Sequence, residues 1–181
     1  MPLPFEVLRR ELVGAHHRQT MFADYVRWPD GTDASYAVWK QPDAALIVPF
    51  SATGTTFLVQ QWRHSWKEDA WELPAGTWEE GEEPMETAQR ELEEEAGLRA
   101  LRWDSLGTAR ATAVSTMRFH FFLARDLSSV PRRPEIYEQD MVIREIPFEQ
   151  ALDEAASGTI QHAASIAALF RAARKLEESK K

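Results

Sequence analysis

The sequence predicts an α/β fold in which a mixed sheet lies between helices. Strand-like segments come first, and a helix, further strands and two closing helices follow them, an order that indicates a sheet covered by helices. The length of 181 residues suits one domain with at most a small appendage. Hydrophobic residues make up 44% and charged residues 28% of the chain, which indicates a packed globule rather than a disordered chain.

The first 41 residues read as short strands that precede the main domain. Segments 5–12, 19–28 and 34–39 have strand character. The run Pro-Asp-Gly-Thr at 29–32 supplies a turn between the last two. We therefore expect an N-terminal antiparallel strand subdomain over residues 1–41 and a main domain over residues 42–181.

The main domain opens on two apolar segments. Residues 44–50 and 56–62 look like a buried pair of strands around the turn at 51–55. Gly158 separates two closing helices. The remaining expected elements are strands at 103–113, 119–124 and 141–146 and helices at 148–156 and 163–178.

Another helix is expected over residues 84–96. Pro84 stands in its first turn, acidic residues follow early, and Gly97 is placed to cap its C-terminus. At about 100° per residue, one narrow apolar stripe runs along this helix and should pack on the sheet. Its members are Met85, Ala88, Leu92 and Ala96.

The net charge of −8 argues against a general nucleic-acid binder, because contacts with phosphates require clustered Lys and Arg. Between residues 68 and 99 the chain has twelve acids and two bases, whereas the rest has 17 acids and 19 bases. The negative excess therefore lies in one window, where self-repulsion must be tolerated or offset by cations.

The composition also limits chemistry and location. The chain has no cysteine, which excludes disulfides and thiolate chemistry. Its longest apolar run has seven residues, against the roughly 20 that a membrane-spanning helix needs, so no membrane partner is expected. The N-terminal segment carries charges where a signal peptide is apolar, and the cytoplasm is the expected compartment.

Three glutamates share one face of the helix expected at 84–96. Glu91 forms like-charge pairs with Glu94 and Glu95 at helical spacing, and such pairs destabilise a helix. The helix dipole disfavours anions near a C-terminus further. Clustered carboxylates suit hard divalent cations such as Mg²⁺ or Mn²⁺. The alternative interpretation is an ordinary solvated acidic face.

The spacing of the acidic residues favours the metal site. From Gly76 to Leu98 the chain reads GTWEEGEEPMETAQRELEEEAGL. This segment resembles the Nudix hydrolase box, in which five residues separate Gly from Glu and seven more precede Arg-Glu-apolar-x-Glu-Glu-x-Gly-apolar. Nine specified positions match: Gly76, Glu82, Arg90, Glu91, Leu92, Glu94, Glu95, Gly97 and Leu98.

The resemblance implies a Nudix-type α/β/α sandwich and a metal-dependent enzyme that hydrolyses a nucleoside diphosphate linked to another group. It implies that Gly76 permits a tight turn in a strand-loop-helix unit. The implied ligands of Mg²⁺ or Mn²⁺ are the Ala75 carbonyl and the carboxylates of Glu91, Glu94 and Glu95.

The same resemblance implies supporting and catalytic roles. Arg90 would hold the glutamates by charge-assisted hydrogen bonds, and Glu82 would brace Arg90. The catalytic base is left open between Glu94 and two loop acids, Glu138 and Asp140. Related pyrophosphatases often carry an acid in that loop.

Segments outside the box are similar to the ADP-ribose pyrophosphatase and nucleoside-diphosphate-sugar hydrolase branch of this family. They are the strand at 44–50, the run QQWRHSWKEDAWELPAG and the late run GTIQHAASIAALF. The N-terminal strand region also belongs to that branch, where it helps to build a dimer and completes the nucleoside pocket of the partner. A homodimer and a small nucleoside diphosphate derivative as substrate are thereby implied.

Three residues outside the box are candidate substrate contacts. Arg63 matches an arginine that contacts phosphates in that branch, with an ordinary ion pair as the alternative. Glu72 would bind a ribose hydroxyl or make a structural hydrogen bond, and Trp28 would stack on a base. Many ADP-ribose enzymes carry a Ser-Pro-Gly-like loop where this chain has residues 112–117 without proline, so GDP-mannose, another sugar nucleotide or a dinucleotide stays open.

Two hypotheses from other functional classes accompany the enzyme. A nucleotide-binding regulator would keep the fold without catalysis, and its usual sequence mark is the loss of a box glutamate, whereas all are present here. A structural acidic domain would bind calcium or a basic partner.

Overall fold

The structure, a computed structural model, describes residues 3–134 and 140–179. It divides into two compact units. The first combines Met1–Asp43 with Ala109–Arg118, and the second combines Ala44–Thr108 with Phe119–Lys181. The N-terminal strand region therefore associates with a segment from the middle of the chain, the segment that contains the loop at 112–117.

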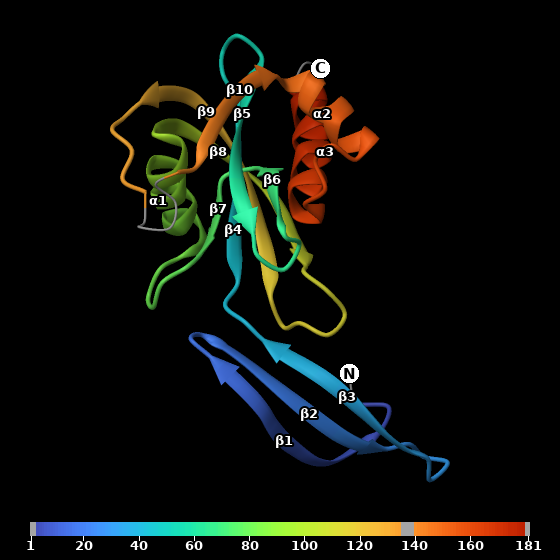
Figure 1. The fold of residues 1–181 in the computed structure, drawn as a ribbon. Helices are drawn as coiled ribbons and strands as arrows, with labels where there is room; N and C mark the ends of the chain where they lie inside the picture. The colour runs from blue at the N-terminus through green and yellow to red at the C-terminus, as the bar shows by residue number, and fades with distance from the viewer. Residues whose placement is uncertain (1–2, 135–139, 180–181) are drawn as a thin grey trace. The chain divides into compact units, whose positions relative to one another are not determined.

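The first unit is a three-stranded antiparallel sheet in the order β1-β2-β3 (Figure 1). Its strands are β1 (Glu6–His16), β2 (Gln19–Arg27) and β3 (Asp33–Lys40), as the sequence predicts. The segment from Ala109 is tied to the edge of β3, since Trp39 N donates to Val114 O at 2.7 Å and Thr116 N donates to Trp39 O at 2.8 Å. All residues of β1 are exposed, and among the described residues of this unit Val26 alone is a fully buried hydrophobic side chain.

The second unit contains two sheets. A mixed sheet has the order β7-β4-β9-β8, with β4 parallel to β9 and antiparallel to β7. A smaller sheet has the order β10-β5-β6. The strands are β4 (Ala44–Pro49), β5 (Thr55–Arg63), β6 (Glu68–Glu72), β7 (Ala75–Thr77), β8 (Leu98–Arg110), β9 (Arg118–Ser129) and β10 (Val142–Pro147), and the helices are α1 (Pro84–Ala96), α2 (Phe148–Ser157) and α3 (Ala163–Glu178).

Helices cover both sides of these sheets, with α1 on one side and α2 and α3 on the other (Figure 1). The stripe of α1 packs as predicted, because Ala88 and Leu92 join a core cluster with Ile47 of β4 and Phe122 of β9. Helix α3 also contacts β4. Successive side chains of a strand point to opposite faces of the sheet. Because helices cover both faces here, all six residues of β4 are buried. The predicted α/β/α sandwich is confirmed.

The expected pairing of the first two apolar strands is wrong. Strands β4 and β5 lie in different sheets, and a single bridge between Phe50 and Thr56 connects them. The reason is that β7 and β9 already occupy both hydrogen-bonding edges of β4, so β5 pairs with β6 and β10 instead.

Helix α1 has the boundaries that the sequence predicts. Pro84 begins it, and Gly97 ends it in the left-handed conformation with a φ of 64°. Glu83 and Glu86 form a reciprocal capping box at the N-terminus. No helix in the described part of the chain is long and apolar enough to cross a membrane.

Candidate active site

The matched segment folds as a strand, a loop and a helix. Gly76 lies within β7, where it pairs with Ala45 of β4. A Cβ atom at Gly76 would stand 1.8 Å from Oε1 of Glu91, so glycine allows the helix carboxylate to approach the strand. The expectation of a tight turn at Gly76 is therefore corrected, because close approach rather than a turn requires glycine there.

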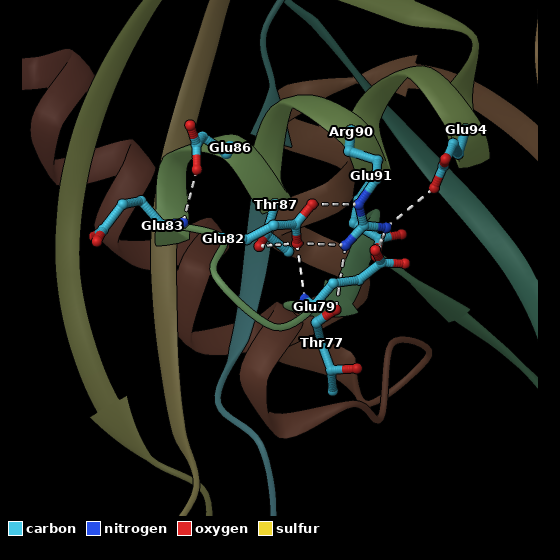
Figure 2. Close-up of polar contacts among 9 residues, drawn as sticks. All are labelled: Thr77, Glu79, Glu82, Glu83, Glu86, Thr87, Arg90, Glu91 and Glu94. Atoms are coloured by element: carbon cyan, nitrogen blue, oxygen red, sulfur yellow. Dashed lines mark hydrogen bonds and ion pairs between the residues drawn. The ribbon is translucent and has the colours of Figure 1, made fainter. Parts of the chain in front are cut away.

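Arg90 lies among three carboxylates at the centre of this unit (Figure 2). Its Nε and Nη2 donate to the two oxygens of Glu82 at 2.9 and 3.0 Å. Its Nη1 donates to Glu91 Oε1 at 2.7 Å and to Glu94 Oε2 at 3.1 Å. Arg90 thus links the loop before α1 with two glutamates of the helix.

Glu82 is fixed by the loop and by the first turns of α1. Its Oε2 accepts hydrogen bonds from Glu79 N at 2.9 Å and from Thr87 Oγ1 at 2.8 Å (Figure 2). The hydrogen bonds from Arg90, and then those from Glu79 and Thr87, outweigh partial burial and lower the pKa of Glu82 to about 2. In return, the Glu82 carboxylate raises the pKa of Arg90. The pair is therefore fully charged at neutral pH.

Glu91 and Glu95 are buried, with 7% and 2% of their surfaces exposed, while Glu94 is more accessible. Glu95 Oε2 accepts a hydrogen bond from Ala75 N at 2.8 Å, so the helix end is bound to the start of β7. The backbone N–H of Ala75 therefore lies beside the Glu95 carboxylate, and the role of its carbonyl as a metal ligand stays a prediction.

Several carboxylates gather near Arg90. Those of Glu82, Glu91 and Glu94 contact its guanidinium, and that of Glu95 lies on Ala75 N. Clustered carboxylates are hard oxygen donors of the kind that suits divalent cations. No three acidic or histidine side chains within the described ranges converge as a ready metal cage, and Arg90 Nη1 stands between Glu91 and Glu94. The donor set fits a divalent metal once the carboxylates turn toward it.

The other acids of the segment have structural partners or lie at the surface. Glu83 and Glu86 form the capping box, and Glu93 pairs with Arg99 at 2.7 Å. Glu79 and Glu80 are in the loop between β7 and α1.

Arg63 and Glu72, two predicted substrate contacts, form an ion pair with each other. Arg63 Nε and Nη2 donate to the Glu72 oxygens at 2.5 and 2.6 Å. Burial alone would raise the pKa of Glu72, but hydrogen bonds from Arg63 and His162 and their charges lower it to about 2. Glu72 is 1% exposed, whereas the Arg63 side chain is 36% exposed, so the arginine is the member of the pair that a ligand in solvent reaches first.

The remaining candidates lie elsewhere in the chain. Trp28 is in the first unit, where its ring packs edge-on against Phe5 with centroids 5.3 Å apart. Asp140 is exposed and lines a groove of the second unit beside Gln60 and Trp62. Glu138 lies outside the described residues.

Three polar residues of the second unit escaped the sequence prediction. Thr87 holds Glu82, His162 contacts Glu72, and Ser165 accepts a hydrogen bond from Leu73 N at 2.9 Å. Thr87 and Ser165 are fully buried. The sequence could have indicated Thr87 and Ser165, because each has a hydroxyl on the apolar side of a helix, where a buried polar group needs a hydrogen-bond partner.

Comparison with known proteins points to one family. The NUDIX domain matches residues 40–169. The chain is 34% identical over 175 residues to an ADP-ribose pyrophosphatase of Mycobacterium tuberculosis (strain ATCC 25618 / H37Rv), covering 92% of this chain and 82% of that protein. It is 33% identical over 135 residues to an ADP-ribose pyrophosphatase of Bacillus subtilis (strain 168), covering 73% of this chain and 72% of that protein.

A solved structure supports the same fold. The crystal structure of an ADP compounds hydrolase matches with a TM-score of 0.86 and covers 98% of this chain and 96% of its own. Sequence identity in that match is 20%, so the comparison describes the fold and not the substrate.

Proposed function

Since this chain belongs to the Nudix hydrolase family, we propose that it hydrolyses the pyrophosphate bond of a nucleoside diphosphate sugar related to ADP-ribose. The products are a nucleoside monophosphate and a sugar phosphate. The observation that carries this proposal is the convergence of Glu91 and Glu94 on Arg90 near the end of α1, where Glu95 binds the backbone of Ala75. The ADP-ribose pyrophosphatases at 33–34% identity support the substrate class.

The proposed metal ligands are the carboxylates of Glu91, Glu94 and Glu95 and the carbonyl of Ala75. Mg²⁺, or Mn²⁺ in its place, supplies charge neutralisation at the diphosphate and a water of lowered pKa when it is bound. Arg90 orients the cluster, because it engages one oxygen each of Glu91 and Glu94 and is itself fixed by Glu82. Ala75 is fixed beside the cluster by its bond to Glu95.

Proton transfer and substrate binding complete the proposed reaction. Glu94, the more exposed glutamate, is the proposed acceptor of the proton from the attacking water, with Glu138 and Asp140 as the alternatives. Arg63 contacts the phosphates and neutralises part of their charge, because its guanidinium is held by Glu72 and is partly exposed. Trp28 is the proposed base contact.

The association state is part of the proposal. Strand β1 exposes Val7, Leu8, Leu12 and Val13, and a sheet with so little buried surface gains stability from a covering layer. We propose a homodimer formed through this unit. Light scattering during size-exclusion chromatography should give twice the 20.7 kDa chain mass, and a single-chain mass at all concentrations would contradict the dimer.

The enzymatic proposal is tested with the purified protein, Mg²⁺ and a substrate panel. The panel contains ADP-ribose, ADP-glucose, GDP-mannose, UDP-sugars, dinucleotides and nucleoside triphosphates, and each reaction runs in ¹⁸O-labelled water. We expect ADP-ribose or a related sugar nucleotide to yield a nucleoside monophosphate and a sugar phosphate, one of which carries the label. Turnover confined to triphosphates would contradict the substrate class, and turnover that persists in EDTA would contradict the metal.

The substrate panel also tests the identity of the sugar, because the loop at 112–117 differs from the Ser-Pro-Gly-like loop of many ADP-ribose enzymes. This segment has no proline and lies in the first unit with β3. GDP-mannose or another sugar nucleotide as the best substrate would assign the enzyme to a different substrate within the same reaction class.

A further inference from the structure

Glu72 is the buried centre of a hydrogen-bond network, of which the proposed reaction uses only the pair with Arg63. It ends β6, and its carboxylate is almost completely inaccessible. Both of its oxygens accept hydrogen bonds from Arg63. A carboxylate in such a site needs further donors to hold one orientation, because each of its oxygens has two lone pairs.

His162 supplies a further contact from the N-terminus of α3. Its Nδ1 lies 3.0 Å from Glu72 Oε2. The imidazole is 19% exposed, and the rings of Trp66 and Phe119 lie near it, with centroids 6.4 and 6.3 Å away. The ring is therefore restrained on several sides while it faces the carboxylate.

Ser165 anchors the same nitrogen from the first turn of α3. Its Oγ lies 2.9 Å from His162 Nδ1 and accepts a hydrogen bond from Leu73 N at 2.9 Å. Leu73 directly follows Glu72 in the chain. The helix start and the end of β6 are thus connected at two points, through the imidazole and through the serine hydroxyl.

The distance between His162 and Glu72 favours one position of the imidazole proton. Glu72 is ionised at neutral pH because its pKa is about 2, so its oxygens only accept hydrogen bonds. A lone pair on Nδ1 at 3.0 Å from Oε2 would repel it. The contact is favourable when Nδ1 carries the proton and donates it to Glu72.

We propose that His162 is a positioning residue that orders Arg63 for the substrate diphosphate through Glu72. The proposal rests on the proposed function, because it takes Arg63 as the phosphate contact. Arg63 gives Nε and Nη2 to Glu72, so the orientation of the carboxylate sets the direction of the whole guanidinium plane. Loss of the imidazole donor removes one of the contacts that hold Glu72 in its orientation, and the carboxylate then restrains the arginine less.

The kinetic test compares His162→Ala with His162→Asn. Alanine removes the donor, and we expect KM for the best substrate of the panel to rise about 5- to 20-fold, with kcat changed less than about twofold. This rise is smaller than the roughly 10- to 150-fold of one lost hydrogen bond to a charged group, because His162 acts on the substrate indirectly. Asparagine places an amide N–H near the position of Nδ1, so it should restore KM to within about threefold of the parent value. Arg174→Ala is the matched control, because this residue of the same helix α3 is exposed and pairs with Glu178.

A spectroscopic test does not depend on turnover. Nitrogen-15 NMR of the parent protein should show His162 with its proton on Nδ1 and a slowly exchanging Nε–H of Arg63. In His162→Ala the Nε–H of Arg63 should exchange at least about tenfold faster, as expected when an ordering hydrogen bond is lost, while His162→Asn and Arg174→Ala keep the parent rate.

The two tests separate the failure of this inference from the failure of the proposed function. An unprotonated Nδ1 in the parent protein, or an unchanged Nε–H of Arg63 in folded His162→Ala, would overturn the positioning role whatever the activity. A parent protein that hydrolyses no member of the panel would refute the proposed function, and the NMR result would still decide whether His162 orders Arg63. Unchanged KM in an active His162→Ala protein would overturn only the inference.

Discussion

Strands β1 and β4 have opposite environments in the same chain. All residues of β1 are exposed, whereas all residues of β4 are buried between α1, α3 and the neighbouring strands. The unit that contains β4 has its own hydrophobic core, and the unit that contains β1 has one fully buried hydrophobic side chain, Val26, among its described residues. Chemistry that needs fixed side chains belongs in a buried environment such as that of β4. Association surfaces belong in an exposed environment such as that of β1.

The largest effect expected from this contrast is on catalysis. Glu95→Gln removes one negative charge from the buried cluster and should lower kcat/KM by about 10²- to 10³-fold, since electrostatic groups of an active site carry effects of that size. Glu11→Gln makes the same chemical change on exposed β1 and should leave kcat/KM within about twofold. The measurement is initial rates with the best substrate at saturating Mg²⁺, together with calorimetric binding of Mn²⁺.

Equal losses of kcat/KM in the two variants would contradict the assignment of catalysis to the second unit alone. A Glu95→Gln protein as active as the parent would contradict the role of Glu95 in catalysis, and nucleotide binding by a parent protein that hydrolyses nothing would favour the regulator hypothesis, in which the cluster serves binding alone.

The next effect concerns the core. Leu92 is fully buried in the cluster between α1 and the mixed sheet, and Leu92→Ala should lower the free energy of unfolding by about 2–5 kcal/mol, the usual cost of a cavity. Leu12→Ala on β1, where the side chain is 60% exposed, should cost less than about 0.5 kcal/mol in dilute protein. Urea unfolding followed by circular dichroism measures both values.

The concentration dependence of Leu12→Ala sharpens the same comparison. A loss that grows with protein concentration shows that a second copy covers β1, because association then contributes to stability. A full core-sized loss in dilute protein would contradict the contrast between the two units.

A smaller effect follows from two glycines that differ only in surroundings. Gly76→Ala places a methyl group on the Glu91 carboxylate, and displacement of that side chain should reduce kcat/KM by about 10- to 100-fold, the range seen when supports of a metal site are changed. Gly14→Ala on β1 meets no atom within 4 Å and should leave activity unchanged. Steady-state kinetics of both proteins decide the matter, and equal activities would contradict the close approach of Glu91 to β7.

The strength of local signals explains which elements the sequence could predict. Helix α1 was predictable from end to end because Pro84, the apolar stripe and Gly97 all agree. The contacts of Arg90 with Glu82 and the helix glutamates were predictable from spacing through a family resemblance.

Other features depend on long-range contacts that no local pattern encodes. Strands β6 and β7 have five and three residues, too few for a clear periodicity. The separation of β4 from β5 depends on which strands fill the edges of β4. Contacts between Glu72, His162 and Ser165 join positions about ninety residues apart, and only the packing of α3 brings them together.

The smallest expected effect is on acid stability, and it again separates the two regions. Glu82 has a pKa of about 2 in the folded protein against 4.5 as its ordinary value, so its ion pair with Arg90 stabilises the fold fully above pH 4.5 and loses this contribution as pH falls to about 2. Asp33 also has a lowered pKa, owing to its hydrogen bond from Arg27, but that pair is exposed and is screened by water and salt. Urea unfolding between pH 7 and pH 2 should therefore show a stability gap between the parent and Glu82→Gln that closes on acidification, and a smaller gap for Asp33→Asn. A gap for Asp33→Asn as large as that for Glu82→Gln would mean that the surface of the first unit is covered. The ion pair of Asp33 with Arg27 would then contribute as much to acid stability as the ion pair of Glu82 with Arg90.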